Sequence, residues 1–147
     1  MGWTANGLGY AKNITYYGAT QRLVSKSNSA GGTGPSLKCN GELSKITSKV
    51  GLITADELAF AGYAYGLQNS TTYLQENATD TYWWSLSPNC FSGGIAGVWN
   101  VNGGIGNGEN SGVSNTLGVR PSISLKSSTT FSNGSGTSED PYVINQK

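Results

Sequence analysis

The chain contains no histidine, and charged residues make up only 12% of its 147 residues. Histidine is the most common general base and zinc ligand in proteins, so its absence removes the usual centre of a hydrolytic or zinc site. The nine Lys and Arg residues are scattered, and the formal net charge is +1, which gives no reason to expect a nucleic-acid partner. No nucleophile–base pair and no cluster of metal ligands stands out. We therefore expect a protein that is not an enzyme and needs no metal or cofactor.

Cysteine is scarce. The two cysteines, Cys39 and Cys90, lie far apart, and their spacing matches neither a metal knuckle nor a Cys-x-x-Cys redox motif. A disulfide between them would contribute about 3–4 kcal/mol on the chain-entropy account. Two independent thiols are the alternative, and the sequence leaves both open.

Long hydrophobic runs are also missing. No stretch reaches the length of about 18 apolar residues that indicates a membrane span, so we expect none in this chain. The first residues, Met1 to Thr4, have neither the basic nor the apolar region of a signal peptide. If the protein is exported, we expect this sequence to begin after the export segment was removed.

The most informative feature of the composition is its 22 glycines, which accompany many Asn, Ser and Thr residues. These residues favour turns and short elements over long helices. The length suits one domain, residues 1–147, that is large enough to bury a core.

The clearest helix signal is a capping box. Thr54 and Glu57 stand three residues apart, so the Thr54 hydroxyl can accept a hydrogen bond from the Glu57 amide while the Glu57 carboxylate reaches back. Asp56 and Glu57 also favour the positive end of the helix dipole. Gly62 and Gly66 mark the helix end. We interpret the carboxylates as structural rather than catalytic.

The strand predictions begin with two short segments, Ile14–Tyr17 and Gln21–Val24. A longer strand starts at Tyr82–Leu86, where the consecutive Trp83 and Trp84 must point to opposite faces. We assign Trp83 to the core and Trp84 to solvent or a ligand.

Between Pro88 and Leu117 the pattern predicts two or three antiparallel strands with tight turns. Val98–Val101 is one strand. Asn102-Gly103-Gly104 suits a hairpin turn of type I′, with Ile105 beginning the return strand. Asn107-Gly108 and Asn110-Ser111-Gly112 are further turn signals.

The C-terminal part is predicted to contain a strand over Gly118–Leu125. Pro121 within it indicates an edge position or a bulge. A loop is predicted over 131–137, and a terminal strand over Tyr142–Ile144.

Four segments, in their order and spacing, carry a resemblance: Gly51–Glu57, Tyr82–Pro88, Gly118–Leu125 and Gly134–Ile144. Over about residues 10–146 the chain resembles bacterial and phage surface proteins with a C-type lectin-like domain. Many of these are variable proteins of diversity-generating retroelements, and some are carried on pilin-like N-terminal segments. The resemblance implies an α+β fold with few short helices, small antiparallel sheets and Gly/Asn-rich loops. It also implies terminal strands paired near one another, a small mixed sheet at the binding end, and an extracellular location on a cell surface or virion.

The resemblance further implies that the tract of residues 89–117 is the variable, ligand-binding region. Its implied contact positions are Asn89, Cys90, Ser92, Gly94, Gly97, Trp99, Asn102, Asn107, Glu109, Ser111, Ser114 and Leu117. On this interpretation Cys90 is a variable position rather than a disulfide partner. Thr54, Glu57, Trp83 and Arg120 belong to the structural framework.

The same fold also hosts calcium-dependent sugar binding, which requires carboxylates in one loop and one strand. Here those places read Ser87-Pro88-Asn89 and Trp99-Asn100-Val101, without a carboxylate. Calcium prefers several oxygen ligands, usually with negative charge, so we expect no calcium site, although Asp80 or Glu139-Asp140 could contribute to one. The fold also hosts formylglycine-generating oxidation, which needs a pair of reactive cysteines that this chain does not place together.

Several alternatives stay open. Arg120 either binds a ligand anion or is structural, paired with Asp80 or Glu57 and with loop carbonyls. Trp99 is either a stacking platform or a core residue. Asn100 and Asn102 are either ligand donors or turn residues.

Two functions follow. The first is a non-catalytic display protein whose tract recognises a protein or glycan target through aromatic anchors among adaptable polar groups. The alternative is a structural pilus or virion subunit that uses the same fold for assembly.

Overall fold

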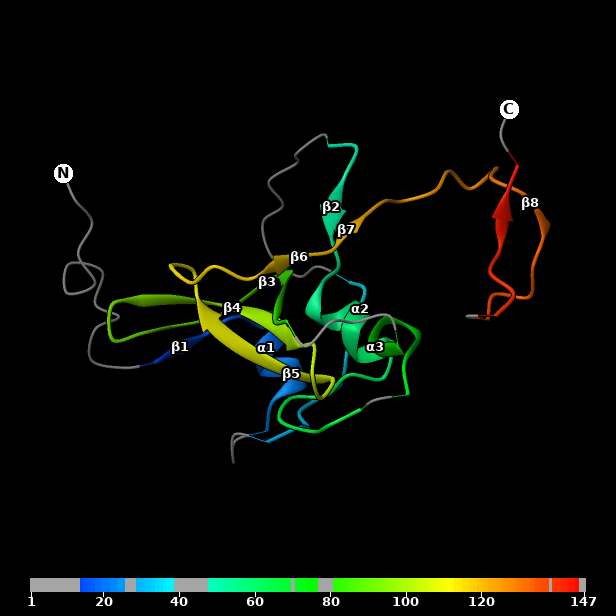
Figure 1. The fold of residues 1–147 in the computed structure, drawn as a ribbon. Coiled ribbons are helices and arrows are strands. Elements are labelled where there is room, and N and C mark those ends of the chain that lie inside the picture. The colour runs from blue at the N-terminus through cyan, green and yellow to red at the C-terminus, as the bar shows by residue number, and fades with distance from the viewer. Residues whose placement is uncertain are drawn as a thin grey trace.

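The computed structural model describes residues 14–25, 29–38, 48–69, 71–76, 81–137 and 139–145 (Figure 1). The fold is mixed but mostly β, with short helices and antiparallel sheets. The helices are α1 (Gly18–Leu23), α2 (Ala55–Phe60) and α3 (Tyr73–Glu76). The strands are β1 (Thr15–Tyr16), β2 (Gly51–Leu52), β3 (Trp83–Ser92), β4 (Ile95–Asn102), β5 (Asn107–Gly112), β6 (Gly118–Val119), β7 (Pro121–Ser122), β8 (Phe131–Asn133) and β9 (Val143–Ile144).

The central sheet has the order β1-β3-β4-β5, all antiparallel, and β6 adds a parallel pairing to β3. β6 lies beside the start of β3 and β1 beside its end, so the two short strands share one edge. Gly93 and Gly94, with φ of 56° and 85°, make the tight turn between β3 and β4. The predicted strands at Ile14–Tyr17, Tyr82–Leu86 and Val98–Val101 are therefore confirmed.

The connection between β4 and β5 differs from the prediction. It is a turn over residues 103–106, closed by the Gly106 amide donating to the Asn102 carbonyl at 2.8 Å. Ile105 lies in this turn and does not begin the return strand, which starts at Asn107. The predicted turns at Asn107-Gly108 and Asn110–Gly112 are also wrong, because both lie within β5 and pair with β4.

The surroundings of Gly108 explain why Asn107-Gly108, a typical turn sequence, lies within a strand here. A Cβ there would lie 3.2 Å from the Trp99 ring, so the missing side chain lets the indole pack against the β5 backbone. The glycine serves this close approach within a strand, not a reversal of the chain.

The predicted strand Gln21–Val24 is wrong, because Gly18–Leu23 forms helix α1. Ala19, Thr20 and Leu23 are its buried residues, a helical spacing that faces one side. Six residues are too few to hold a helix by propensity alone. Packing against β3 and α2 stabilises the helical conformation of this segment. The local sequence pattern does not reveal that contact.

The capping box at the start of α2 is confirmed. Thr54 Oγ1 accepts from the Glu57 amide at 3.2 Å, and Glu57 Oε2 accepts from the Thr54 amide at 2.8 Å. The helix ends at Phe60, and Gly62 follows with a left-handed φ of 97°. The Ala55 amide donates to Ser87 Oγ at 2.9 Å, which fixes the helix start to β3.

Asp56, expected only to favour the helix dipole, is a buried ion-pair residue. Its carboxylate accepts from Arg22 Nε at 2.9 Å and Nη2 at 2.6 Å, and from the Ser36 amide at 2.8 Å. Burial raises the pKa of Asp56, but these hydrogen bonds and the Arg22 charge outweigh it and hold the pKa below its usual value. The bidentate pair joins α1 to α2 and brings the Ser36 segment against both.

The core consists of two hydrophobic clusters. In one, Trp83 is 3% exposed and packs edge-to-face on Tyr63, with ring centroids 6.3 Å apart. The Arg120 guanidinium lies 4.9 Å from the Trp83 ring centroid, and its Nη1 donates to the Leu74 carbonyl. The core assignment of Trp83 is confirmed. These contacts agree with a structural role for Arg120, which uses the ring and a carbonyl of α3, while Glu57 bonds to Thr54 instead.

The other cluster decides the open question about Trp99. Its side chain is 3% exposed and packs with Ala19, Leu23 and Ala55. Its ring centroid lies 5.4 Å from that of Tyr65 in an edge-to-face pair. Trp99 is a core residue and is not available as an exposed stacking platform.

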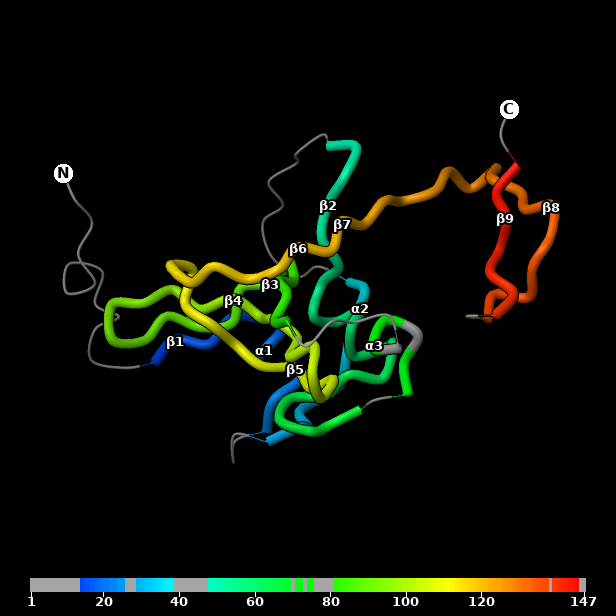
Figure 2. Tube along the Cα trace, in the orientation of Figure 1, coloured from blue at the N-terminus to red at the C-terminus, as the bar shows by residue number. Residues whose placement is uncertain are grey.

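The predicted strand Gly118–Leu125 is divided in the structure. β6 pairs with β3, whereas β7 pairs with β2 in a separate two-stranded sheet. Arg120 lies between β6 and β7. Pro121 belongs to β7, which is an edge strand because its sheet contains only β2 and β7. Residues 123–130 continue without a strand and lead away from the body (Figure 2).

The chain closes with a β8–β9 hairpin that stands apart from the body (Figures 1 and 2). The terminal strand predicted at Tyr142–Ile144 is confirmed, but Phe131–Asn133 is a strand rather than the predicted loop. β9 pairs with β8, and β1 pairs with β3. These first and last described strands therefore do not pair with each other, contrary to the expectation drawn from the resemblance.

Candidate functional site

The tract of residues 89–117 forms the end of β3, all of β4 and β5, and the loop toward β6. It does not present one continuous surface. Four of its predicted contact residues are buried: Asn89 is 1%, Trp99 3% and Asn107 6% exposed, and Gly97 is buried as well. The remaining positions are distributed over the end of β3, the β4–β5 hairpin, the β3–β4 turn and the loop after β5.

An irregularity in β3 brings together the first group of predicted residues, which lies at the end of this strand. Pro88 pairs with Val98 and Cys90 with Gly97, so Asn89 is an extra residue on β3. Such a β-bulge re-aims side chains that a regular strand would send to opposite faces. Consecutive Asn89 and Cys90 consequently line the same pocket.

This pocket, which we call the Asn89 pocket, has a volume of about 230 Å³. It lies where β1, α1 and the strands β3 and β5 meet. Its lining residues carry no Lys, Arg, Asp or Glu; they are Ile14, Tyr16, Thr20, Tyr65, Asn89, Cys90, Ser92 and Asn110. The pocket is thus neutral, with aromatic, hydroxyl and amide groups around it.

Backbone and hydroxyl groups hold the walls of the pocket. Thr20 Oγ1 donates to the Asn89 carbonyl at 2.9 Å and accepts from Trp99 Nε1 at 2.8 Å. The Tyr17 amide also donates to the Asn89 carbonyl, at 2.9 Å. Asn110 Nδ2 donates to the Tyr65 hydroxyl at 3.2 Å. These bonds anchor the backbone at Asn89 and orient Tyr65.

The Asn89 side chain is held differently from its backbone, because its Nδ2 is buried and has no hydrogen-bond partner among the residues that the structure describes. A buried donor without an acceptor costs about 1–3 kcal/mol. Such groups need an explanation, and an absent ligand at a functional site is one. Here the donor belongs to a residue that lines a neutral, open pocket.

Cys90, on the same wall, is half-buried and carries a free thiol. Burial raises the pKa of this thiol above its ordinary value, so it stays protonated at neutral pH. Cys90 is therefore a small polar wall residue rather than a nucleophile. Cys39, the other cysteine, lies outside the described residues; of the two alternatives, the free Cys90 agrees with independent thiols.

A second group of predicted residues lies on the other face of the β4–β5 hairpin. Cross-strand pairing places Asn102 opposite Asn107 and Asn100 opposite Glu109. Asn100 Nδ2 donates to Ser111 Oγ at 2.6 Å. This face is polar, and the aromatic Trp84, which pairs with Asn100, lies half-buried beside it.

The side chains of this second group bond within the protein only in part, because Asn100 Oδ1 and Asn107 Oδ1, like Asn89 Nδ2, are buried without a hydrogen-bond partner among the described residues. Asn102 Nδ2 donates to the Tyr82 hydroxyl at 2.7 Å, and its Oδ1 accepts from the Gly104 amide at 3.0 Å. Asn102 is thus a turn residue that is also tied to the sheet. Asn100, fully buried, acts within the sheet and not as a surface donor.

The remaining predicted positions are small or peripheral. Gly94 forms the β3–β4 turn, and Gly97 faces Cys90, whose Sγ would lie 3.2 Å from an added Cβ. Ser114 is exposed in the loop after β5, and Leu117 is half-buried before β6. The structure therefore brings Asn89, Cys90, Ser92 and Gly97 together, and it separates them from the other tract positions.

Sequence reasoning missed more than half of the pocket. Ile14, Tyr16, Thr20 and Tyr65 lie outside the tract, and Asn110 was interpreted as a turn residue. The pairing of Tyr16 with Cys90 brings the β1 wall into place across more than half of the chain. A local pattern does not reveal this pairing.

Metal ligands do not gather in the part of the chain that the structure describes, where no group of three or more Cys, Asp or Glu residues could hold an ion. Asp140 accepts from the Ser135 amide at 2.9 Å, so it supports the β8–β9 hairpin. Asp80 lies outside the described residues. No helix among the described residues is long and apolar enough to cross a membrane.

No protein-family model, curated protein or solved structure matches this chain.

Proposed function

We propose that this chain is a non-catalytic ligand-binding domain of the C-type lectin-like class, displayed outside the cell or on a virion. Its tract of residues 89–117 recognises a protein or glycan target. The mixed sheet, the short helices and the resemblance of four ordered segments support the class. The composition of the tract, rich in Asn, Ser and Gly, supports a recognition surface.

The Asn89 pocket is the observation that carries this proposal. A protein that had no use for the Asn89 amide would gain stability by replacing it with an apolar side chain of the same shape. Two tyrosines, Tyr16 and Tyr65, line the same pocket as Asn89. A neutral ligand group with a hydrogen-bond acceptor and one apolar face would satisfy the amide and stack on a ring.

The experiment is an amide NMR titration with two sets of neutral probes, methyl glycosides and capped neutral amino acids. We expect members of one set to shift the side-chain NH₂ resonances of Asn89 and Asn110. Shifts by the glycosides would indicate a glycan target, and shifts by the capped amino acids a protein target.

Asn89→Leu tests the role of the amide because it keeps the branching and heavy-atom count of the side chain. It should abolish the shifts at Asn110. Asn115→Leu is the matched control, since Asn115 is exposed in the loop after β5 and does not line the pocket. The proposal fails if no probe shifts these resonances, or if both variants respond like the wild type.

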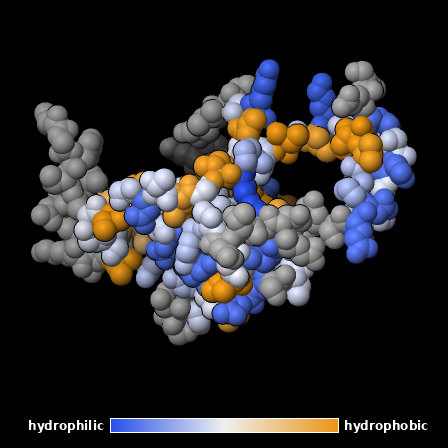
Figure 3. Space-filling model, in the orientation of Figure 1, coloured by the Kyte–Doolittle hydropathy of each residue, from blue (hydrophilic) through white to orange (hydrophobic). Residues whose placement is uncertain are grey.

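A second candidate function, assembly as a pilus or virion subunit, is favoured by the β8–β9 hairpin. Phe131, Tyr142, Val143 and Ile144 are 56%, 54%, 51% and 41% exposed there. Apolar surface also runs along the segment that joins the hairpin to the body (Figure 3). Exposed apolar surface of this extent commonly marks a protein interaction site.

Sedimentation of the full chain over a wide concentration range tests assembly. Self-association that Val143→Asp removes would support it, because a charge opposes burial of this surface. Val50→Asp is the matched control: Val50 is 50% exposed on the body, close to the 51% of Val143. A monomer at all concentrations, or equal effects of the two variants, would exclude assembly through the hairpin.

A further inference from the structure

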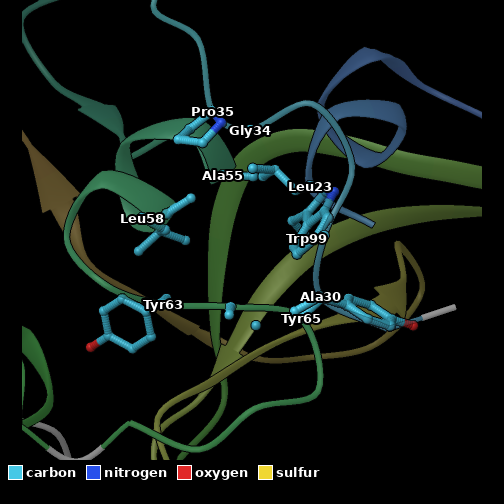
Figure 4. A pocket seen from close by; sticks show the side chains of 13 residues that line it. Leu23, Ala30, Gly34, Pro35, Ala55, Leu58, Tyr63, Tyr65 and Trp99 are labelled. Carbon is cyan, nitrogen blue, oxygen red and sulfur yellow. The ribbon is translucent and has the colours of Figure 1, made fainter. Parts of the chain in front are cut away.

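A second cavity shares one lining residue, Tyr65, with the Asn89 pocket. Its volume is about 140 Å³. Its larger lining residues are Leu23, Ala55, Leu58, Tyr63, Tyr65 and Trp99, and small residues of the 30–35 segment complete it. Figure 4 shows Leu58 and Tyr63 on one side of the space and Leu23 and Trp99 on the other.

The cavity separates the two hydrophobic clusters of the core. Leu23, Ala55 and Trp99 belong to one cluster, and Leu58 and Tyr63 to the other. Protein interiors are packed as densely as organic crystals, whereas this space interrupts the core and is partly open to solvent. Because the space is unfilled, side chains of the two clusters lose van der Waals contacts that they could otherwise make with each other.

The polar atoms around the cavity are already bonded elsewhere. The Tyr63 hydroxyl accepts from Thr72 Oγ1 at 2.9 Å. The Tyr65 hydroxyl accepts from Asn110, and Trp99 Nε1 donates to Thr20. No Lys, Arg, Asp or Glu lines the space. The cavity thus offers an occupant dispersion and apolar contact but no free polar side chain, the opposite of the Asn89 pocket.

Small residues keep the space open. Ala30, Gly31 and Gly34 form one wall, and Ala55, Ala59 and Ala64 contribute to the others. Gly31 and Gly34 have φ of 150° and 94°, so larger residues would be strained at both positions.

We propose that this cavity binds one apolar group of about the size of a benzene ring. An apolar cavity of about 150 Å³ in another protein stays dry and binds benzene, so volume and lining agree with this occupant. The inference concerns a different cavity and a different chemistry from the proposed function, and it stands if the Asn89 pocket proves empty. Tyr65 lines both spaces.

The experiment uses benzene as the probe, with methyl NMR and thermal unfolding as readouts. We expect benzene to shift the methyl resonances of Leu23 and Leu58. At ten times its Kd, benzene should raise the melting temperature by about 3–6 °C. Absence of both effects would overturn the proposal.

Ala59→Leu fills the cavity from α2 and should remove both effects. Ala30→Leu fills it from the opposite wall and serves if the first variant does not fold. Ala61→Leu is the matched control, because Ala61 is exposed just after α2 and does not line the cavity. Benzene effects that persist in both filling variants would place benzene elsewhere and contradict the assignment.

A free aromatic molecule and a side chain of a protein partner share this chemistry, and N-acetyl-phenylalaninamide distinguishes them. Its ring must enter while the capped backbone stays outside. Shifts by both probes would identify a side-chain subsite, and shifts by benzene alone would identify a small-molecule site.

Discussion

Asp56→Asn offers the sharpest test of how the fold is held together. Asp56 is 5% exposed, and its carboxylate accepts three hydrogen bonds, two from Arg22 and one from the Ser36 amide. Asparagine keeps the shape but removes the charge that faces Arg22. Removing one partner of a buried pair typically costs about 3–5 kcal/mol. The Arg22 side chain is 26% exposed, and water screens it, so we expect about 2–3 kcal/mol here.

The pH dependence of this effect has a definite sign. Arg22 and Ser36 hold the pKa of Asp56 below its usual value against the opposing effect of burial. A lowered carboxyl pKa contributes stability that is complete above the unfolded-state pKa, about 4, and is lost as the pH falls through the folded-state pKa. The difference in unfolding free energy between wild type and Asp56→Asn should therefore shrink in acid.

Urea unfolding at neutral pH and at about pH 3 measures both quantities. Glu139→Gln is the control, since Glu139 is exposed, and it should change stability by less than about 0.5 kcal/mol. A cost for Asp56→Asn below about 1 kcal/mol, or one that is equal at the two pH values, would refute the account of the ion pair.

Two further predictions concern single side chains. Asn89→Leu removes a buried donor without a partner, so urea unfolding should show equal or greater stability, by up to about 3 kcal/mol; a clear loss would mean that the amide is structural. Gly106→Ala should lower stability by more than about 1 kcal/mol, because φ is 67° and an added Cβ would overlap the Asn69 carbonyl. Gly51→Ala, with open space around the added methyl, should not destabilise, and equal effects of the two glycine variants would contradict this.

The parts of the fold that were predicted correctly depend on neighbouring residues. Thr54 and Glu57 stand three residues apart, and their reciprocal bonds form within one turn of helix. The assignment of Trp83 to the core required only the alternation of a strand.

The errors arise where distant residues decide the conformation. Arg22 lies in a helix because its segment packs on α2 and β3, and its partner Asp56 is 34 residues away. Asn107 and Asn110 are residues typical of turns, yet their pairing with β4 makes them part of a strand. Local propensity is a weak prior that tertiary pairing overrides.

The candidate site was predicted only in part for the same reason. Asn89, Cys90 and Ser92 were identified through the resemblance, but their common direction depends on a bulge that the sequence does not mark. Tyr16 and Tyr65 reach the pocket from other elements. The tract pattern also gave no indication that its residues would divide between two faces of one hairpin.

The location of a bound ligand tests the central claim most directly. Intermolecular NOEs from whichever neutral probe binds should connect it to the rings of Tyr16 and Tyr65, which line the Asn89 pocket. NOEs confined to Trp84 on the opposite face of the sheet, or to Phe131 on the β8–β9 hairpin, would contradict the assignment of the Asn89 pocket as the binding site.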